Sequence, residues 1–362
     1  MAKKALDQEV ARVVEDLAGK AHYGQVTLVL GAGISLSRKV PSWASLAKSI
    51  WRETFNTSYP FVSRSGTQLH PFSHQFALEL VEQELSKPEG LCDADQFAAV
   101  IARAIYKTVR RPSSRAPGDT LGILARVLRR EAQKGSERRI QRVITFNVDS
   151  LLEDEVNRER SPRERPRVWP MARASDVLRY RQAIPIYHLH GYLPYSWYAL
   201  KEGTTTKLKV SRAKWKGSTK KRSDHQLYDP TSDVLVFTDS QYWKMSTTPA
   251  SFANRILSTA LHDSNCVFIG LSFTDVNLVR WLGMGAVERE MDLKSEASIE
   301  SRSSVPGFRS HRQPHFWIRT ENADPGGLIS RLLDMRGVNT IRIDSWQSRQ
   351  FDRVMEQCFP PD

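Results

Sequence analysis

Short continuous runs of apolar residues recur along the chain, separated by longer segments in which apolar residues repeat every three or four positions. A continuous apolar run is typical of a buried parallel strand, and the longer repeat is typical of an amphipathic helix. Strands are predicted over residues 25–30, 142–149, 184–191, 234–239 and 266–273, with outer strands over 315–318 and 340–343. Strands separated by helices predict a mostly parallel, doubly wound sheet.

The helical repeat is strongest near the N-terminus and in a block before the second strand. Residues 5–19 carry apolar side chains at spacings of three and four, and Gly19 is suited to end that helix. Ser42 is a suitable N-cap for a helix over 43–54. From residue 43 to 134 the pattern remains mostly helical, which we interpret as a helical layer inserted between the first and second core strands.

These elements predict an α/β protein with a Rossmann-like sheet. We assign residues 1–42 and 135–345 to the sheet domain, 43–134 to the helical insertion and 346–362 to a C-terminal tail. A Ser-rich and charged segment over 292–312 is typical of a flexible loop.

Polar residues follow four of the predicted strands. The first strand ends at Gly31, Ala32 and Gly33, with Ser35 just beyond, and such a glycine turn before a helix can hold a pyrophosphate. A third glycine of the dinucleotide fingerprint is missing, because Leu36 stands in its place. An ordinary strand-to-helix turn therefore remains an alternative. Because ligands of doubly wound sheets bind beyond the carboxyl ends of strands, the coincidence of four polar strand ends indicates a binding site.

Composition narrows the class of protein. Apolar residues make up 40% of the 362 residues, enough for a packed core, and no run of about 18 apolar residues predicts a transmembrane helix. The N-terminus lacks the apolar region of a secretory signal, so we expect a cytoplasmic protein without membrane contact. The three cysteines form no C-x-x-C pair, so we expect no four-cysteine zinc ribbon and no metal site.

The formal net charge is +13 and is unevenly distributed. Residues 158–167 hold five arginines against two glutamates, and residues 201–223 hold nine Lys or Arg against a single Glu, a net charge of +8. Such a run is typical of a solvated loop, but it is also suited to bind nucleic acid or an acidic partner. The sequence leaves both interpretations open.

The four strand ends together resemble the motifs of the sirtuin superfamily, more closely its bacterial sirtuin-like defence NADases than the protein deacylases. Residues 31–35 match the family's first signature, with Pro41 where its proline belongs. Residues 145–149 are similar to the Thr-Gln-Asn-Ile-Asp signature, with Phe in the Gln place. Residues 190–191 resemble the His-Gly motif, and residues 270–272 are similar to the Gly-Thr-Ser turn at the ribose end.

Two departures from the deacylase pattern are informative. Ser42-Trp43-Ala44 stands where deacylases carry Asp-Phe-Arg, and residues 192–229 contain no cysteine where the zinc ribbon should follow. The resemblance therefore implies the NAD-handling half of the machinery without recognition of an acyl-lysine peptide.

Applied residue by residue, the resemblance implies an enzyme that cleaves the bond between nicotinamide and ribose in NAD. Asn147 would bind a ribose hydroxyl or the attacking water, and His190 would accept a proton. Asp149 would bind the nicotinamide amide or offer negative charge to the developing cation, and Asp275 is a weaker candidate on the adenosine side. The NAD-binding residues would be Gly31, Ala32, Gly33, Ser35, Thr145, Gly270, Ser272 and Asn277.

The residues also admit plainer roles. Asn147 and Asp149 can cap the following helix, and His190 beside a glycine can be a turn residue. We expect His188 to face away from His190 and to be structural.

The resemblance also implies a role in antiphage defence through NAD depletion, with activation by oligomerisation or by a partner such as a HerA-like ATPase or another nucleic-acid-handling protein. A non-catalytic nucleotide-binding subunit of a DNA-processing complex is the alternative, and the basic segments favour it.

Overall fold

A computed structural model describes most of the chain. The described residues are 2–22, 26–61, 73–86, 95–109, 119–158, 164–173, 176, 182–201, 235–248, 251–273, 278–288, 291, 315–346 and 349–361. Several predictions made from the sequence lie outside these ranges. They concern Asp275, Asn277, the loop over 292–312 and nearly all of the basic segment 201–223.

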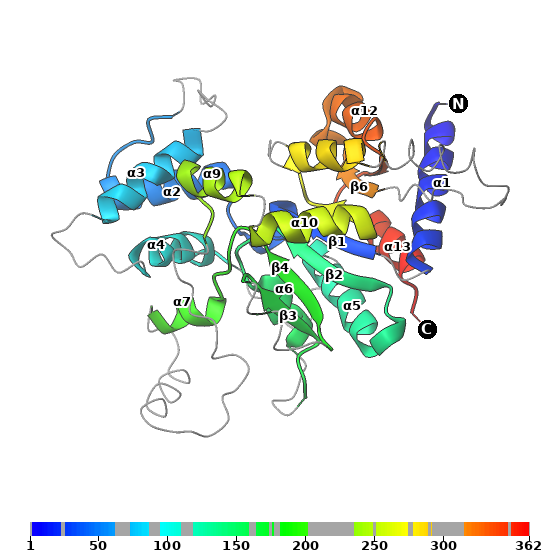
Figure 1. Cartoon of the computed structure of the whole chain (residues 1–362), viewed down its shortest axis with the longest axis horizontal. Helices are drawn as coiled ribbons and strands as arrows, with labels where there is room; N and C mark the ends of the chain where they lie inside the picture. Colours follow the sequence, from blue (N-terminus) through cyan, green and yellow to red (C-terminus); the bar gives the residue numbers. More distant parts are fainter. Residues whose placement is uncertain are drawn as a thin grey trace.

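Seven parallel strands form one sheet at the centre of the molecule (Figure 1). Along the sheet the order is β3 Val168–Met171, β4 Ile184–His188, β2 Ile140–Thr145, β1 Val26–Leu30, β5 Asn265–Ile269, β6 His315–Thr320 and β7 Val338–Ile343. Strand β1 pairs in parallel with both β2 and β5. The predicted α/β fold with a doubly wound, Rossmann-like parallel sheet is confirmed.

One strand prediction was wrong and one strand was not foreseen. Residues 235–237 are irregular and lead into helix α9 Asp239–Thr247, where a strand over 234–239 was predicted. Thr238 starts this helix through a capping box with Gln241, and that polar cap outweighs the short apolar run before it. Strand β3 was missed because it is only four residues long and contains Pro170, which its edge position tolerates.

Helices cover both faces of the sheet. Their bounds are α1 Ala2–His22, α2 Trp43–Phe55, α3 Ser73–Leu85, α4 Asp95–Tyr106, α5 Thr120–Gln133, α6 Leu151–Asn157, α7 Tyr195–Lys201, α10 Phe252–Asp263, α12 Leu328–Asp334 and α13 Arg349–Cys358, with a further helix over 278–288. The helices predicted over 5–19 and 43–54 are present, but Gly19 does not end the first of them, which continues to His22. Ser42 caps α2 as predicted, accepting from the Ser45 amide. Helices α2 to α5 lie between β1 and β2 in sequence, where the inserted helical layer was predicted.

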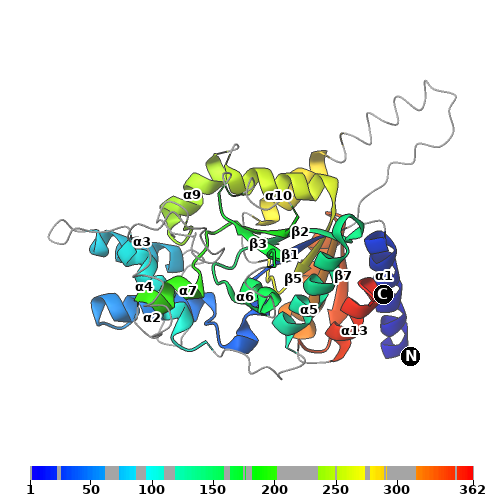
Figure 2. The same cartoon turned by 90° about the horizontal axis from the view of Figure 1, so that it is seen from below.

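Successive side chains of β1 point to opposite faces of the sheet and belong to two different apolar cores. Leu28 and Leu30 point into the core shared with α1, α5, α6 and α13, whereas Val29 points into the core shared with α10 and the helix over 278–288. Figure 2 shows α10 on one side of the sheet and α5, α6 and α13 on the other. Because both faces are covered, the central strands are apolar on both sides and read as continuous runs.

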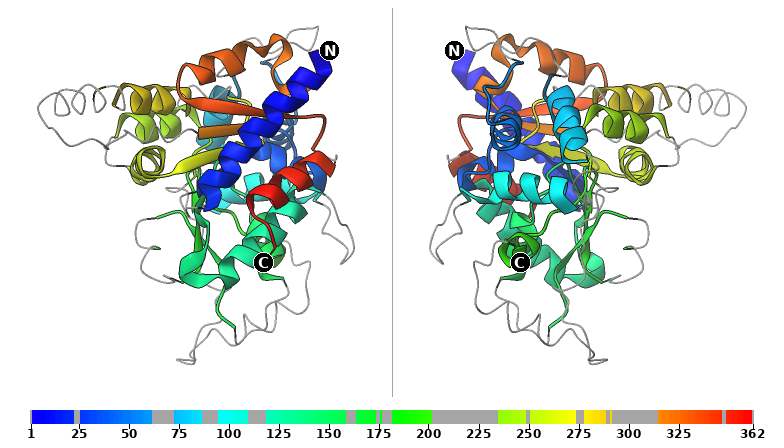
Figure 3. Two further views of the ribbon diagram at one scale, coloured as in Figure 1. Left: turned by 90° about the vertical axis from the view of Figure 1, so that its right-hand side faces the viewer. Right: turned by 90° about the vertical axis from the view of Figure 1, so that its left-hand side faces the viewer.

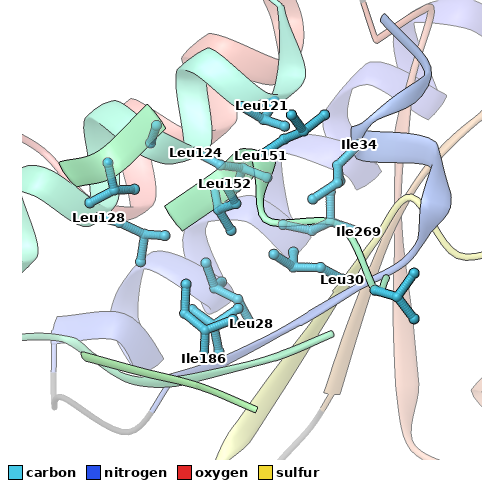
Figure 4. Packing of buried hydrophobic residues seen from close by; sticks show 14 of the residues in the cluster. Leu28, Leu30, Ile34, Leu121, Leu124, Leu128, Leu151, Leu152, Ile186 and Ile269 are labelled. Carbon is cyan, nitrogen blue, oxygen red and sulfur yellow. The ribbon is translucent and has the colours of Figure 1, made fainter. Parts of the chain in front are cut away.

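The larger core joins distant parts of the chain. Figure 4 shows Leu121, Leu124 and Leu128 of α5 packed over Leu28 and Ile186 of the sheet, with side chains of α6 beside them. Helix α13, within the segment 346–362 that the sequence analysis named a tail, buries Phe351 and Met355 in the same core. Figure 3 shows α13 beside α1, so the first and last helices of the chain pack together on this face.

The turns that follow β1 and β5 touch through their backbones. The amides of Gly31 and Gly33 donate to the carbonyl oxygens of Ile269 and Gly270, both at 3.0 Å. A Cβ on Gly33 would lie 2.7 Å from the Gly270 Cα, and one on Gly31 would lie 2.5 Å from the Leu271 side chain. Gly270 itself has φ +69°, the left-handed region that favours glycine. Glycine is therefore required here for the close approach of two loops.

We expect Gly33→Ala to lower the free energy of unfolding by about 1–3 kcal/mol, because its Cβ would overlap backbone atoms of Gly270 that cannot rotate away. Gly19→Ala is the matched control, since its Cβ would meet nothing within 4 Å in helix α1, and it should raise stability by about 0.5–1 kcal/mol. Urea denaturation measures both variants. Equal stability of Gly33→Ala and the wild type would contradict the close approach.

Candidate functional site

The four polar strand ends lie on adjacent strands. Strands β4, β2, β1 and β5 are neighbours in the sheet and run in the same direction, so their carboxyl ends share one edge. The order of the chain reverses between β1 and β5, which is where doubly wound sheets bind their ligands. Residues from four distant segments thus meet at the expected position.

Four main-chain amides of the glycine turn are used within the fold. The amides of Gly31, Gly33, Ile34 and Ser35 all donate to main-chain carbonyl oxygens, two of which belong to the end of β5 and the turn after it. In place of one continuous helix, two short 3-10 turns follow, Ala32–Ile34 and Leu36–Arg38. The assignment of the turn to NAD binding stays a prediction, and its glycines are accounted for by loop packing.

Three predicted site residues are joined by hydrogen bonds at the ends of β1 and β2. The Asn147 side-chain amide donates to the Ser35 hydroxyl at 3.3 Å, and this hydroxyl lies 3.3 and 3.5 Å from the two Asp149 carboxyl oxygens. Thr145 supports these three residues, because its hydroxyl accepts a hydrogen bond from the main-chain amide of Asn147 at 3.0 Å. The cluster brings together a hydroxyl, an amide and a carboxyl group, which are suited to bind ribose hydroxyls or water.

Asp149 is a buried carboxyl group with a perturbed pKa. Its pKa is raised from 3.8 to about 6, chiefly by burial. Nearby Glu153 contributes to the increase, and the Leu151 amide, His188 and Ser35 oppose it. The Leu151 amide donates to Asp149 at 3.1 Å, so the predicted capping role is present alongside the contact to Ser35. A carboxyl group with this pKa changes its charge close to neutrality.

A buried ion-pair network holds the loop that carries Ser35. Arg38, at the end of the second 3-10 turn, pairs with Asp119 at the start of α5 and lies 3.5 Å from Glu155 of α6. Asp119 also accepts from the Gly122 amide at 2.8 Å as the N-cap of α5. The loop after β1 is therefore tied to both helices beneath the sheet.

The two histidines at the end of β4 face different elements. His190 is 8% exposed, and its ring lies 5.1 Å from Phe146 and 5.1 Å from Tyr242. His188 faces α6, where it contacts Glu153, as expected for a structural side chain. Strict alternation would place both rings on one side of the sheet, but the strand ends at His188 and the following turn redirects His190.

Helix α9 covers His190 and was not foreseen. Tyr242 packs on the His190 ring, and the Val236 amide donates to the His190 carbonyl oxygen at 3.0 Å. Helix α3 holds the start of α9, because Glu79 accepts from the Ser240 amide and hydroxyl. The sequence contains no signal for this contact, because the link between α9 and β4 is purely tertiary.

The remaining site predictions lie at the β5 turn or outside the described residues. Ala32 and Ser272 are exposed, and Gly270 lies in the turn that touches Gly33. Asn277 is outside the described residues. Within the described ranges, no group of three or more His, Cys, Asp or Glu is placed to hold a metal ion. The same ranges contain no helix that is both long enough and apolar enough to cross a membrane.

We predict that ionisation of Asp149 destabilises the protein as the pH rises. The folded protein binds the Asp149 proton more tightly than the unfolded chain does. The free energy of unfolding therefore falls between about pH 4 and pH 6, and above pH 6 it stays below its value at pH 4. Asp149→Asn should not show this decrease. Between pH 4 and pH 7, its free energy of unfolding should therefore rise by on the order of 3 kcal/mol relative to that of the wild type.

Thermal unfolding across that pH range provides the measurement. Asp334→Asn, at an exposed position of α12, is the control and should leave the pH dependence as in the wild type. Parallel curves for Asp149→Asn and the wild type would show that folding does not shift the pKa of Asp149.

Comparison with known proteins assigns the family. The SIR2-like domain family matches residues 141–322, just over half of the chain and including β2 to β6. No curated protein matches the chain. The matched segment contains Asn147, Asp149 and His190 but not the glycine turn, which the sheet brings to the same edge. The family implies that the protein binds and processes NAD. The chain belongs to the SIR2-like domain family.

Proposed function

We propose that the protein is an NAD+ glycohydrolase that cleaves the nicotinamide–ribose bond to give nicotinamide and ADP-ribose. One observation carries the proposal: Ser35, Asn147 and Asp149 form a hydrogen-bonded cluster on adjacent strands, and His190 ends the next strand of the same sheet. Family membership supplies the NAD chemistry, and the cluster supplies groups that suit its reacting end.

Cleavage of this bond passes through an oxocarbenium-like state, as in glycoside hydrolysis. The leaving nicotinamide is already cationic in NAD+, so its departure needs no general acid. The protein must stabilise positive charge at the ribose carbon and place a water to attack it. Water supplies the hydroxyl group of ADP-ribose, and its proton passes to a base or to solvent.

Each residue of the site has a separate role in this reaction. Asn147 binds a ribose hydroxyl or the attacking water through its side-chain amide, which the Ser35 contact orients. His190 accepts the proton, since imidazole titrates near neutrality. Asp149, with a pKa of about 6, offers negative charge to the cation once ionised. The adenosine half is assigned to the β5 side through Gly270, Ser272 and Asn277.

The biological role follows from the resemblance to bacterial defence NADases. We propose that the protein depletes NAD during phage infection and that it is activated as a homo-oligomer or by a partner such as a HerA-like ATPase or another nucleic-acid-handling protein. The basic residues over 201–223 are candidates for contact with nucleic acid.

We expect His190→Ala to lower nicotinamide release by 10²- to 10⁴-fold, the range for removal of a positioned proton acceptor. Asn147→Ala should lower it by about 10²-fold, because the ribose or the attacking water is no longer held in place. Asn339→Ala on β7 and His262→Ala on α10 remove the same side-chain types away from this edge of the sheet and should leave turnover unchanged. Nicotinamide is measured by chromatography with and without the product of the neighbouring gene. Intact NAD binding without turnover in any state would contradict the enzymatic function.

The alternative is a non-catalytic nucleotide-binding subunit of a DNA-processing complex. In that case DNA affinity should fall steeply with salt, because lysine and arginine release counterions from phosphates. Asn147→Ala would then leave function intact. Loss of cell toxicity in Asn147→Ala at unchanged expression would exclude this alternative.

A further inference from the structure

A buried histidine and a buried glutamate lie directly behind the candidate site. His188 at the end of β4 is 1% exposed, and its Nε2 lies 2.6 Å from the Oε1 of Glu153 on α6. Its other ring nitrogen, Nδ1, lies 2.8 Å from the main-chain oxygen of Asn147. One ring thus connects a helix beneath the sheet to the loop that follows β2.

The contact with Asn147 shows which nitrogen of the His188 ring carries a hydrogen. A main-chain carbonyl oxygen only accepts, so Nδ1 of His188 carries the hydrogen and donates to Asn147. Glu153 then faces Nε2, where the 2.6 Å contact requires one more hydrogen, carried by the ring or by the carboxyl group. Glu153 therefore holds the ring in the orientation in which Nδ1 faces the carbonyl oxygen, as a hydrogen-bond partner on one nitrogen orients the other.

Stability alone does not account for this pair. The second oxygen of Glu153 is buried and has no hydrogen-bond partner among the described residues. A buried carboxylate with half of its acceptors unused is costly, and apolar residues of similar volume often serve a core as well or better. What the pair does achieve is to hold the main-chain carbonyl group of Asn147 in place.

Both main-chain groups of Asn147 are held. Its amide donates to the Thr145 hydroxyl at 3.0 Å, and its carbonyl oxygen accepts from His188. With the backbone held on both sides, the side-chain amide is directed to Ser35 at 3.3 Å. Small displacements of a reacting group lower the rate strongly. Fixing the backbone of Asn147 should therefore affect turnover more than substrate binding.

We propose that Glu153 and His188 are a positioning pair that fixes Asn147 for NAD cleavage, an inference that rests on the proposed function. Glu153 orients the ring, the ring holds the Asn147 carbonyl, and Asn147 holds the ribose hydroxyl or the water. Neither member of the pair touches the substrate.

Two matched double variants separate positioning from bulk packing. In Glu153→Gln/His188→Asn, the Asn amide nitrogen takes the place of Nδ1 and still reaches the Asn147 carbonyl oxygen. In Glu153→Gln/His188→Gln, the longer amide takes the place of Nε2 and loses that contact. Glu153→Gln in both avoids leaving a buried carboxylate without its partner.

We expect the Asn variant to keep kcat within about tenfold of the wild type and the Gln variant to lose about 100-fold in kcat, with KM for NAD little changed in either. Thermal unfolding of both variants shows whether they are folded. Equal kcat values in two folded variants would overturn the proposal.

A second measurement does not depend on turnover or on the variants. The imidazole ¹⁵N resonances of His188 in the wild-type protein report which ring nitrogens carry hydrogen, and we expect these to include Nδ1. An unprotonated Nδ1 would show that the Asn147 contact does not form and would overturn the proposal. Absence of NAD cleavage with a protonated Nδ1 would instead count against the proposed function alone, because Asn147 would still be held.

Discussion

The arrangement of the site depends on the contact between the turns after β1 and β5. Two main-chain hydrogen bonds and the absence of side chains at Gly31, Gly33 and Gly270 allow these turns to meet. The contact sets the path of the chain from β1 to Ser35, and Ser35 then reaches Asn147 and Asp149 on the neighbouring strand. Steric exclusion of any larger residue at three positions therefore decides where the polar cluster lies.

Burial gives the site its chemical character. Asp149 and Glu153 are carboxyl groups in a nearly closed environment between the sheet and α6, and each is kept there by a small number of directed contacts. Burial moves the pKa of Asp149 to about 6, and the pairing of Glu153 keeps one imidazole ring in place. The same low polarity that makes such groups costly also strengthens their effect on a developing charge.

Most of the sheet could be predicted from the sequence, because strands covered on both faces are apolar throughout. The failures were local: a capping box at Thr238 starts a helix after an apolar run, and Pro170 obscures a short edge strand. Within the site, motif order placed Asn147, Asp149 and His190 on adjacent strands. The contacts of Tyr242 and Glu153 could not be predicted, because they depend on how α9 and α6 pack against the sheet.

The placement of β1 also defines the minimal folding unit. Residues 141–322 include β2 and β5, yet these strands do not pair with each other, because β1 lies between them and pairs with both. A fragment cut at the limits of the family match also lacks β7, the partner of β6. It would therefore expose unpaired edges on β2, β5 and β6 and open both apolar cores. For this protein, the boundaries of recognisable similarity and of autonomous folding do not coincide.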